Sequence, residues 1–288
     1  MSILPQLIAN SLIAASTYAL VALGFNLIYA TTKFFNLAHG AMAVVGGYAV
    51  FFLLGTFTGI NVVFAVIIGA LLAGFLGWAL DRAVYVPLRK RKASNMVMLV
   101  ASLGAFTVIQ AVIAMLFTSQ FQTLSNFAGG KVYSIGGAAI TGTQVIIFFA
   151  ALMIMIGLLV LLKKTMFGKA VRAVSDDEEV AKIVGINTER IIGWVFFVGS
   201  AIAGLAGVLV GFDTGIQPTM GMNLLLKGVI AAIVGGIGSV WGAVAGALLL
   251  GFAENFGIWK ISGEWKDAIA FGLLIIFLIF RPQGVVKR

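Results

Sequence analysis

The sequence predicts an all-α integral membrane protein, a polytopic helical bundle of about eight transmembrane helices with one further broken or half-span segment. Hydrophobic residues make up 61% of the chain and charged residues only 10%, and the mean hydropathy is +1.11. The hydrophobic residues form runs of about 20, the length that an α-helix needs to cross a bilayer. We therefore expect residues 1–288 to form a single transmembrane domain.

Each of the predicted spans is an apolar run bounded by polar or glycine-containing segments. The first run has no basic residue before it, so we interpret it as a true membrane helix and not as a cleaved signal peptide. In chain order the predicted spans are 6–29, 40–57, 60–81, 95–118, 144–163, 190–212, 240–258 and 266–281.

The basic residues predict the orientation of the chain. Fifteen of the 19 Lys and Arg residues lie around Lys33, within 82–94 and 163–190, and in the tail from Arg281. Because basic residues are retained on the cytoplasmic side during insertion, all four segments are expected inside, with the N-terminus outside and the C-terminus inside. The other four, among them Lys227, are expected outside or at a boundary. The net charge of +9 is therefore a topology signal and not a nucleic-acid-binding surface.

The residue types exclude several kinds of chemistry. There is no cysteine, which excludes disulfides, thiolate catalysis and sulfur-ligated metals, and the single histidine, His39, excludes a histidine-rich metal site. We expect no catalytic residue and no metal site. Asp213 and Glu254 fall near the predicted outer ends of spans, so the sequence offers no clear mid-bilayer carboxylate for ion coupling.

Counting crossings inward from both ends requires one more membrane segment between residues 212 and 240. The apolar stretch available there is Gly228–Gly238, which as a helix would be only about 16 Å long. A half-span that ends in glycines resembles the broken helices of transporter pathways, where irregular backbone is tolerated beside a cavity or inside protein. We therefore predict that Gly235 and Gly236 lie on the pathway.

A second interruption occurs where the first apolar run gives way to the second. It contains three polar residues, Asn26, Asn36 and His39. One interpretation is a polar loop at the cytoplasmic surface. The other is a discontinuous segment that places these residues on the pathway, and both interpretations stay open at this point.

Small residues recur four positions apart within the later spans. They are Gly199, Ala203, Gly207 and Gly211 in one span, and Gly238, Gly242 and Gly246 in the next. Such stripes let helix backbones approach closely. We expect them to pack within the chain, with contact to a second membrane subunit as the alternative for one stripe.

The segment from Gly168 to Gly185 is strongly charged and predicts a short amphipathic helix of about 10 residues in water. Ser175 and Glu178 fit a capping box at its start, and Gly185 fits the C′ position at its end. An apolar face follows at i, i+3, i+4 spacing, made by Val180, Ile183 and Val184.

This helix has three possible roles. A connector lying on the bilayer is disfavoured because the four consecutive acids 176–179 would be repelled by anionic headgroups. A magnesium-diphosphate site of a membrane transferase is disfavoured because the acids are sequential and no second acidic cluster exists. Docking to a soluble partner is the preferred interpretation.

Motifs spread along nearly the whole chain resemble those of one known family. They are Gly168-Lys169-Ala170-Val171-Arg172-Ala173 followed by Asp177, Ala181 and Gly185-Ile186-Asn187; Gly24–Tyr29 with Asn36–Gly40; Gly235–Ser239 with Gly242; and Phe280–Gly284. Together they resemble the branched-chain amino acid permeases of the LivH type, which are importer subunits of ATP-binding-cassette systems.

The resemblance implies a bacterial inner-membrane system of two related permease subunits, two cytoplasmic ATPases and a substrate-binding protein outside the membrane. The second permease would be a relative or a second copy of this chain. ATP and magnesium would be held by the ATPases and no cofactor by this chain, whose sequence lacks a G-x-x-x-x-G-K-[ST] phosphate loop. A coupling loop at about 164–189 would contact the ATPases through Gly168, Arg172, Asp177, Glu178, Glu179, Val180, Val184 and Gly185.

The resemblance also suggests the substrate and leaves alternatives. Leucine, isoleucine and valine are the implied substrates, and permeases for urea or short-chain amides share the same motifs. An ion-coupled secondary carrier for amino acids is a further alternative, which a required ATPase partner would exclude.

Overall fold

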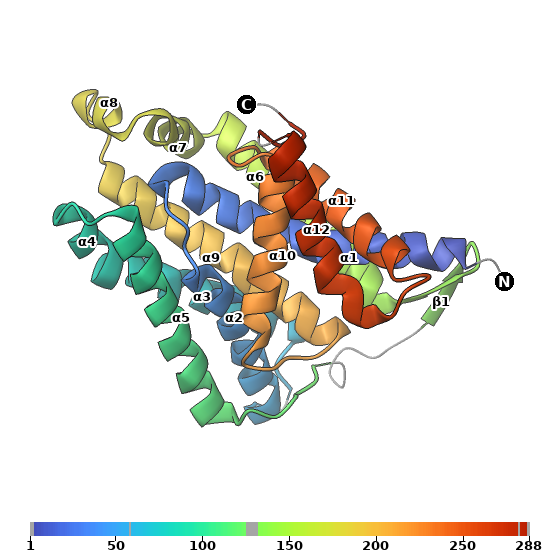
Figure 1. The fold of residues 1–288 in the computed structure, drawn as a ribbon. Coiled ribbons are helices and arrows are strands. Elements are labelled where there is room, and N and C mark those ends of the chain that lie inside the picture. Colours follow the sequence, from blue (N-terminus) through green and yellow to red (C-terminus); the bar gives the residue numbers. More distant parts are fainter. Residues whose placement is uncertain (1–2, 58, 125–131, 282, 287–288) are drawn as a thin grey trace.

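The computed structural model describes residues 3–57, 59–124, 132–281 and 283–286, which are almost entirely helical (Figure 1). The helices are α1 Leu4–Thr32, α2 Ala38–Thr56, α3 Val62–Leu80, α4 Val86–Lys90, α5 Asn95–Phe117, α6 Gly142–Lys164, α7 Met166–Asp176, α8 Glu178–Ile183, α9 Thr188–Asp213, α10 Met220–Gly235, α11 Val240–Gly257 and α12 Lys266–Phe280. An antiparallel hairpin of β1 Val132–Ile135 and β2 Ala138–Thr141 precedes α6.

Seven helices of the described ranges are long and apolar enough to cross a membrane. They are α1, α2, the continuous segment Val62–Lys90, α5, α6, α9 and α11. The segment Val62–Lys90 contains one π-helical turn, Asp81–Tyr85, between α3 and α4. The predicted fold class is therefore confirmed. The last predicted span, 266–281, forms α12, whose 15 residues are fewer than the about 20 of a typical span.

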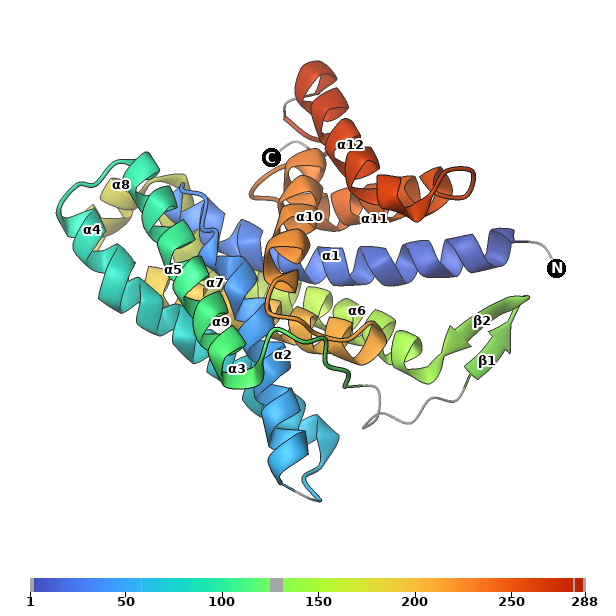
Figure 2. The same ribbon diagram turned by 60° about the horizontal axis from the view of Figure 1, so that its bottom comes forward.

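The predicted half-span is longer than the sequence analysis expected. It begins at Met220 instead of Gly228 and ends at Gly235, so that α10 has 16 residues and is about 24 Å long. Its end at the glycines agrees with the prediction, whereas its start was missed because Lys227 marks the preceding stretch as polar. In Figure 2, α10 stands between α1 and the exposed α12.

The middle of the bundle is formed by α1, α2 and α9, which are mostly buried, whereas most residues of α3, α5 and α6 are exposed or only partly buried. Helix α9 packs against α1, α2 and α3, and α1 also packs against α6, α10 and α11 (Figure 1). The exposed apolar helices have the surface expected to face lipid. The polar connection of α7 and α8 lies at one end of the bundle, where α6 ends and α9 begins.

The small-residue stripe on α9 packs within the chain, as expected. A Cβ atom on Gly199 would lie 2.9 Å from the Gly24 carbonyl oxygen of α1, and one on Gly207 would overlap the Ala43 carbonyl of α2. On the following stripe, Gly242 and Gly246 likewise meet the backbone of α10. The helices therefore touch backbone to backbone, which dispersion forces favour in a membrane.

Gly207→Ala is expected to lower the thermal unfolding temperature of the purified complex, because the added methyl group overlaps the Ala43 carbonyl. Overpacking of this kind costs about 1–3 kcal/mol, more than the helix propensity of about 0.5–1 kcal/mol gained by replacing glycine. Gly104→Ala is the matched control, since nothing lies within 4 Å of its added Cβ. Equal unfolding temperatures for the two variants would contradict the prediction.

Candidate functional site

The two interruptions predicted from the sequence meet in the structure. The side chain of Asn26, in the buried part of α1, reaches the break between α10 and α11. Its Nδ2 donates to the Ser239 carbonyl at 3.1 Å, and its Oδ1 accepts from the Gly238 N–H at 3.0 Å. One amide thus satisfies a donor and an acceptor of irregular backbone, each of which would cost several kcal/mol if left unpaired in hydrocarbon.

The break itself depends on glycine. Gly236 has φ +112°, which side-chain-bearing residues rarely adopt, and a Cβ on Gly235 would overlap the Gly242 carbonyl. The tail after α12 covers the end of α10. There the N–H groups of Val285 and Val286 donate to the carbonyls of Val234 and Gly235 at 2.9 and 3.0 Å. Gly235 and Gly236 are therefore packed against protein backbone on both sides.

Asn36 and His39 are buried as well, so the interpretation of an exposed polar loop does not hold for them. Asn36 Oδ1 accepts from the Tyr85 hydroxyl at 2.9 Å and from the Ala38 N–H at 3.1 Å, which fixes the connection between α1 and α2 to the π-helical turn. The ring of His39 lies beside Phe25 and beneath Gly24. These two residues hold helices together, and the role of either on a pathway stays a proposal.

A buried cluster of charges, which was not evident from the sequence, joins helices of the bundle. Lys227 of α10 forms an ion pair with Glu254 of α11 at 3.1 Å, and Glu254 is completely buried. The Tyr18 hydroxyl of α1 donates to Glu254 Oε2 at 2.7 Å, and Asp267 of α12 lies 3.3 Å from Lys227 Nζ. Four helices are joined here. The sequence did not predict that Lys227 and Glu254 lie inside the bundle, because they are on separate segments and no local sequence pattern pairs them.

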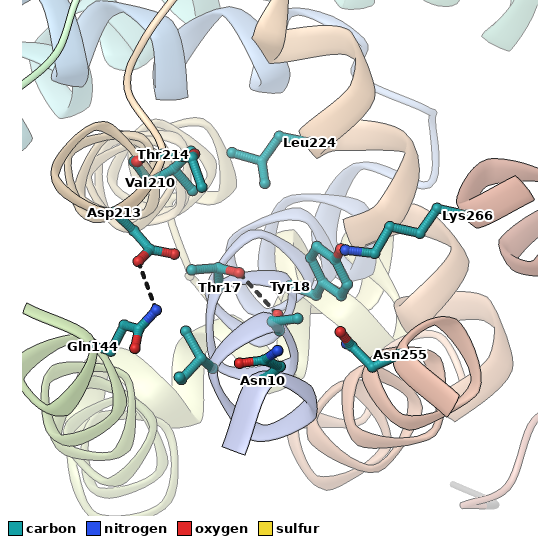
Figure 3. Close-up of a pocket in the computed structure, with 12 residues that line it drawn as sticks. Asn10, Thr17, Tyr18, Gln144, Val210, Asp213, Thr214, Leu224, Asn255 and Lys266 are labelled. Atoms are coloured by element: carbon teal, nitrogen blue, oxygen red, sulfur yellow. Dashed lines mark hydrogen bonds between the residues drawn. The ribbon is translucent and has the colours of Figure 1, made fainter. Parts of the chain in front are cut away.

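A cavity of about 390 Å³ lies next to this cluster, at the end of α9 remote from α7 and α8 (Figure 3). Side chains of α1, α6, α9, α10, α11 and α12 line it, and Asp213, Lys266 and Tyr18 are among them. Of the polar residues in this lining, only Asp213 was assigned to a span end from the sequence.

The charged segment at the opposite end forms two helices, α7 and α8, instead of the single helix predicted. Asp177 separates them and is the N-cap of α8, because its carboxylate accepts from the N–H groups of Glu179 and Val180 at 2.8 and 3.0 Å. The expected capping box of Ser175 and Glu178 is therefore wrong. Ser175 is buried in the last turn of α7. Asp177 is the N-cap because its backbone is extended and its carboxylate accepts from two free N–H groups at once.

Two predicted contact residues are used inside the chain. Arg172 donates through Nη1 to the Leu162 carbonyl near the end of α6, and a Cβ on Gly168 would overlap the same carbonyl. The guanidinium thereby complements the negative end of the α6 dipole. Gly168 and Arg172 fix the corner between α6 and α7.

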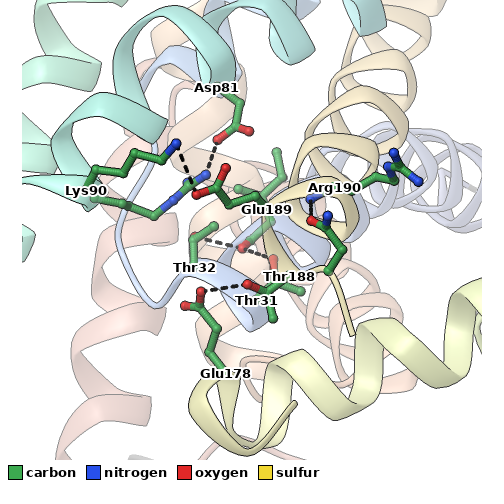
Figure 4. Close-up of polar contacts among 11 residues, drawn as sticks. Thr31, Thr32, Asp81, Lys90, Glu178, Thr188, Glu189 and Arg190 are labelled. Atoms are coloured by element: carbon green, nitrogen blue, oxygen red, sulfur yellow. Dashed lines mark hydrogen bonds and ion pairs between the residues drawn. The ribbon is translucent and has the colours of Figure 1, made fainter. Parts of the chain in front are cut away.

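Glu178 connects α8 to α9. It accepts from the Thr188 hydroxyl at 3.1 Å (Figure 4) and also pairs with Lys182 at 2.7 Å. Lys90 pairs with Glu189 at 3.5 Å and so fixes α4 to the start of α9 at the same end of the bundle. The short helix α8 is therefore held to the membrane-spanning helices by its own acidic side chain.

The outward face of α8 is apolar. Ile183 is 82% exposed, Val184 68% and Val180 53%, and Glu179 is exposed beside them. Gly185, with φ +86°, ends the helix as predicted: its N–H donates to the Lys182 carbonyl and that of Ile186 to the Ala181 carbonyl, both at 3.0 Å. Ile183 belongs to this face by its i+3 spacing but was missing from the predicted contact residues.

The comparisons with known proteins agree with this architecture. Residues 7–278 match the family described as "Branched-chain amino acid transport system / permease component". The chain belongs to this family. The permease is thus a transport component of an ATP-binding-cassette system and not itself an enzyme. Within the described ranges no group of three or more His, Cys, Asp or Glu could hold a metal ion.

Individual relatives cover almost the whole permease. The high-affinity branched-chain amino acid transport system permease proteins BraD of Pseudomonas aeruginosa and LivH of Escherichia coli are each 33% identical over 98% of this chain and 95% of their own lengths. The solved structure of PsaBC from Streptococcus pneumoniae in complex with Fab has a TM-score of 0.54 at 16% identity, and the match covers 95% of this chain and 91% of that one. This last likeness concerns the fold alone.

Asn26→Leu is expected to destabilise the permease, because the isosteric side chain leaves the Gly238 N–H and the Ser239 carbonyl without their partner. Each unsatisfied buried group costs about 1–3 kcal/mol. The measurement is the thermal unfolding temperature of the purified complex. Asn95→Leu is the control, since that exposed amide makes, within the described part of the chain, one long hydrogen bond of 3.4 Å to the Lys33 carbonyl. Unfolding of Asn26→Leu at the parent temperature would disprove the bridging role.

Proposed function

We propose that this permease imports branched-chain amino acids, leucine, isoleucine and valine, in a complex driven by partner ATPases. It would pair with a second related permease subunit or with a second copy of itself. Two cytoplasmic ATPases would bind ATP and magnesium, and a binding protein outside the membrane would deliver the substrate. The family match and the names of the relatives, which are branched-chain amino acid permeases, support this assignment.

The face of α8 is the observation that supports ATPase docking. Val180, Ile183 and Val184 are exposed in a helix that lies beyond the ends of the membrane-spanning helices, where lipid tails do not cover them. Such an apolar patch on a polar connection is typical of a protein interface. Glu179 of α8 and Asp176 at the end of α7 are exposed too, and among the described residues they form no ion pair. They are the acids available to an ATPase, whereas Arg172 and Glu178 are engaged within the chain.

The proposed orientation places α7 and α8 in the cytoplasm of a bacterium, with the N-terminus outside the inner membrane. Basic residues support it, because Lys33, the residues of α4 and its following turn, and the α6–α7 corner all lie at the end of the bundle that carries α8. The cavity with Asp213 then opens toward the outer side, where a binding protein would release substrate.

Glu179→Arg combined with Val180→Asp is expected to weaken ATPase docking without unfolding the spans, and Ile183→Asp alone is expected to do the same. Burying a new carboxylate at an apolar contact costs several kcal/mol. The amount of ATPase that co-purifies with the tagged permease should fall at least about tenfold, which corresponds to 1.4 kcal/mol.

Met166→Asp is the matched control for this experiment. It also places a carboxylate at a strongly exposed apolar residue of the same connection, but at the start of α7. It should retain ATPase binding. Normal recovery of the complex and normal uptake with the α8 variants would rule out α8 as the docking element.

Uptake of radiolabelled leucine tests both substrate and coupling. Cells that lack their own importer would express this permease with its neighbouring permease, ATPases and binding protein, with and without an ATPase phosphate-loop mutation. Leucine uptake is expected, and the mutation should abolish it. Leucine uptake that is unchanged by the ATPase mutation would point to a secondary carrier. Uptake of urea in place of leucine would overturn the assigned substrate.

A further inference from the structure

The geometry points to the cavity between α1, α9 and α12 as a binding site for a free aliphatic α-amino acid, with Asp213 receiving the ammonium group and Lys266 the carboxylate. The inference rests on the proposed function and adds to it the residues that would recognise the substrate inside the membrane part of the importer. It starts from the two charges of the cavity wall.

Asp213 and Lys266 reach the cavity from opposite sides (Figure 3). Asp213 is the last residue of α9, and Lys266 is the first residue of α12. Gln144 Nε2 donates to Asp213 Oδ1 at 3.1 Å, which orients the carboxylate. Among the described residues, Asp213 has no cationic partner, and the Lys266 ammonium group takes part in no ion pair and no hydrogen bond.

The neighbouring ion pair shows by contrast why these two charges stand out. Lys227 and Glu254 neutralise each other at 3.1 Å, and Tyr18 completes the coordination of Glu254. Lys227 also pairs with Asp267 at 3.3 Å, so every charge of this cluster has a partner within the protein. Asp213 and Lys266 are separated by the cavity, so each charge lacks the counter-charge that a partly buried group requires. A zwitterion supplies both counter-charges at once.

The rest of the lining fits the remainder of such a molecule. Ile13, Ala14, Val210 and Leu224 provide an aliphatic wall, and Asn10, Thr17 and Asn255 add uncharged hydrogen-bonding groups. The volume of about 390 Å³ lies within the range of about 300–1,000 Å³ typical of small-molecule sites. The wall thus has an aliphatic part and, by number of residues, a larger polar part, which suits a small molecule with one aliphatic and one charged end.

The chain contains no cysteine, which allows a direct occupancy measurement. Thr214→Cys places a single thiol on the exposed residue beside Asp213 that lines the cavity. The whole complex would be reconstituted in lipid nanodiscs without the binding protein, and modification of this chain by an uncharged maleimide would be followed with increasing L-leucine. Leucine is expected to slow the modification of Thr214→Cys and to leave that of Ser262→Cys, outside the cavity, unchanged.

Charge-removing variants then test the assigned roles. In the Thr214→Cys background, Asp213→Asn and Lys266→Met should each raise the half-protecting leucine concentration about tenfold, the loss expected for one charge-assisted hydrogen bond. Isoamylamine carries only the ammonium group and 4-methylpentanoate only the carboxylate. Lys266→Met should abolish protection by 4-methylpentanoate and retain protection by isoamylamine, and Asp213→Asn should show the reverse. If Asp213 and Lys266 had only a structural role, each substitution would change protection by both analogues to the same extent.

The matched controls are Lys260→Met and Glu264→Gln, which remove charges from the exposed α11–α12 connection outside the cavity lining. In both variants, leucine should protect Thr214→Cys at the same concentration as in the parent. The site assignment is overturned if leucine fails to protect Thr214→Cys in a complex that imports leucine once the binding protein is added, or if both charge variants are protected like the parent. The proposed function fails separately, by absence of ATPase-dependent leucine uptake, because the protection assay requires neither hydrolysis nor the binding protein.

Discussion

The break between α10 and α11 leaves irregular, partly buried backbone between helices, and its polar groups need hydrogen-bond partners there. The helix stops at Gly235, and the chain turns through glycines before α11 begins at Val240. Asn26 from the first helix and the N–H groups of Val285 and Val286 near the other end of the chain supply the missing hydrogen bonds. The packing of α1, α10, α11 and the tail follows from this requirement, since each must lie within hydrogen-bond distance of the break.

The local features of this region were accessible from the sequence, because they depend on residue type alone. Asn26 is a polar side chain in an apolar run, and Gly235 and Gly236 interrupt another. Their meeting in space was not accessible, because about 200 residues separate them and no periodicity links the two segments. The membrane spans themselves were predicted well for the same reason: length and hydropathy are local, and the bilayer imposes both.

Charged residues were the main source of error. Lys227 indicated an aqueous stretch, and Glu254 a span end, because a single charge in hydrocarbon is costly. Each is tolerated inside since the other neutralises it, and that pairing is a property of the fold. In the charged connection, the intrachain bonds of Arg172 to α6 and of Glu178 to α9 were not evident from the sequence, because they join separate helices. The contact of these two residues with a partner stays a prediction. The apolar residues of α8 were predicted from helical spacing and are exposed.

Helix α9 joins the two ends of this arrangement without interruption. Its first residue, Thr188, donates to Glu178 of α8, and its last, Asp213, forms part of the cavity wall. Its 26 residues span about 39 Å as one continuous helix, which contains no proline or π-helical turn but does contain the Gly199-Ser200 pair. One continuous helix therefore links the connection that carries α8 to the wall of the cavity. A movement of α8 would have a direct route to Asp213 through this helix, past its close glycine contacts with α1 and α2.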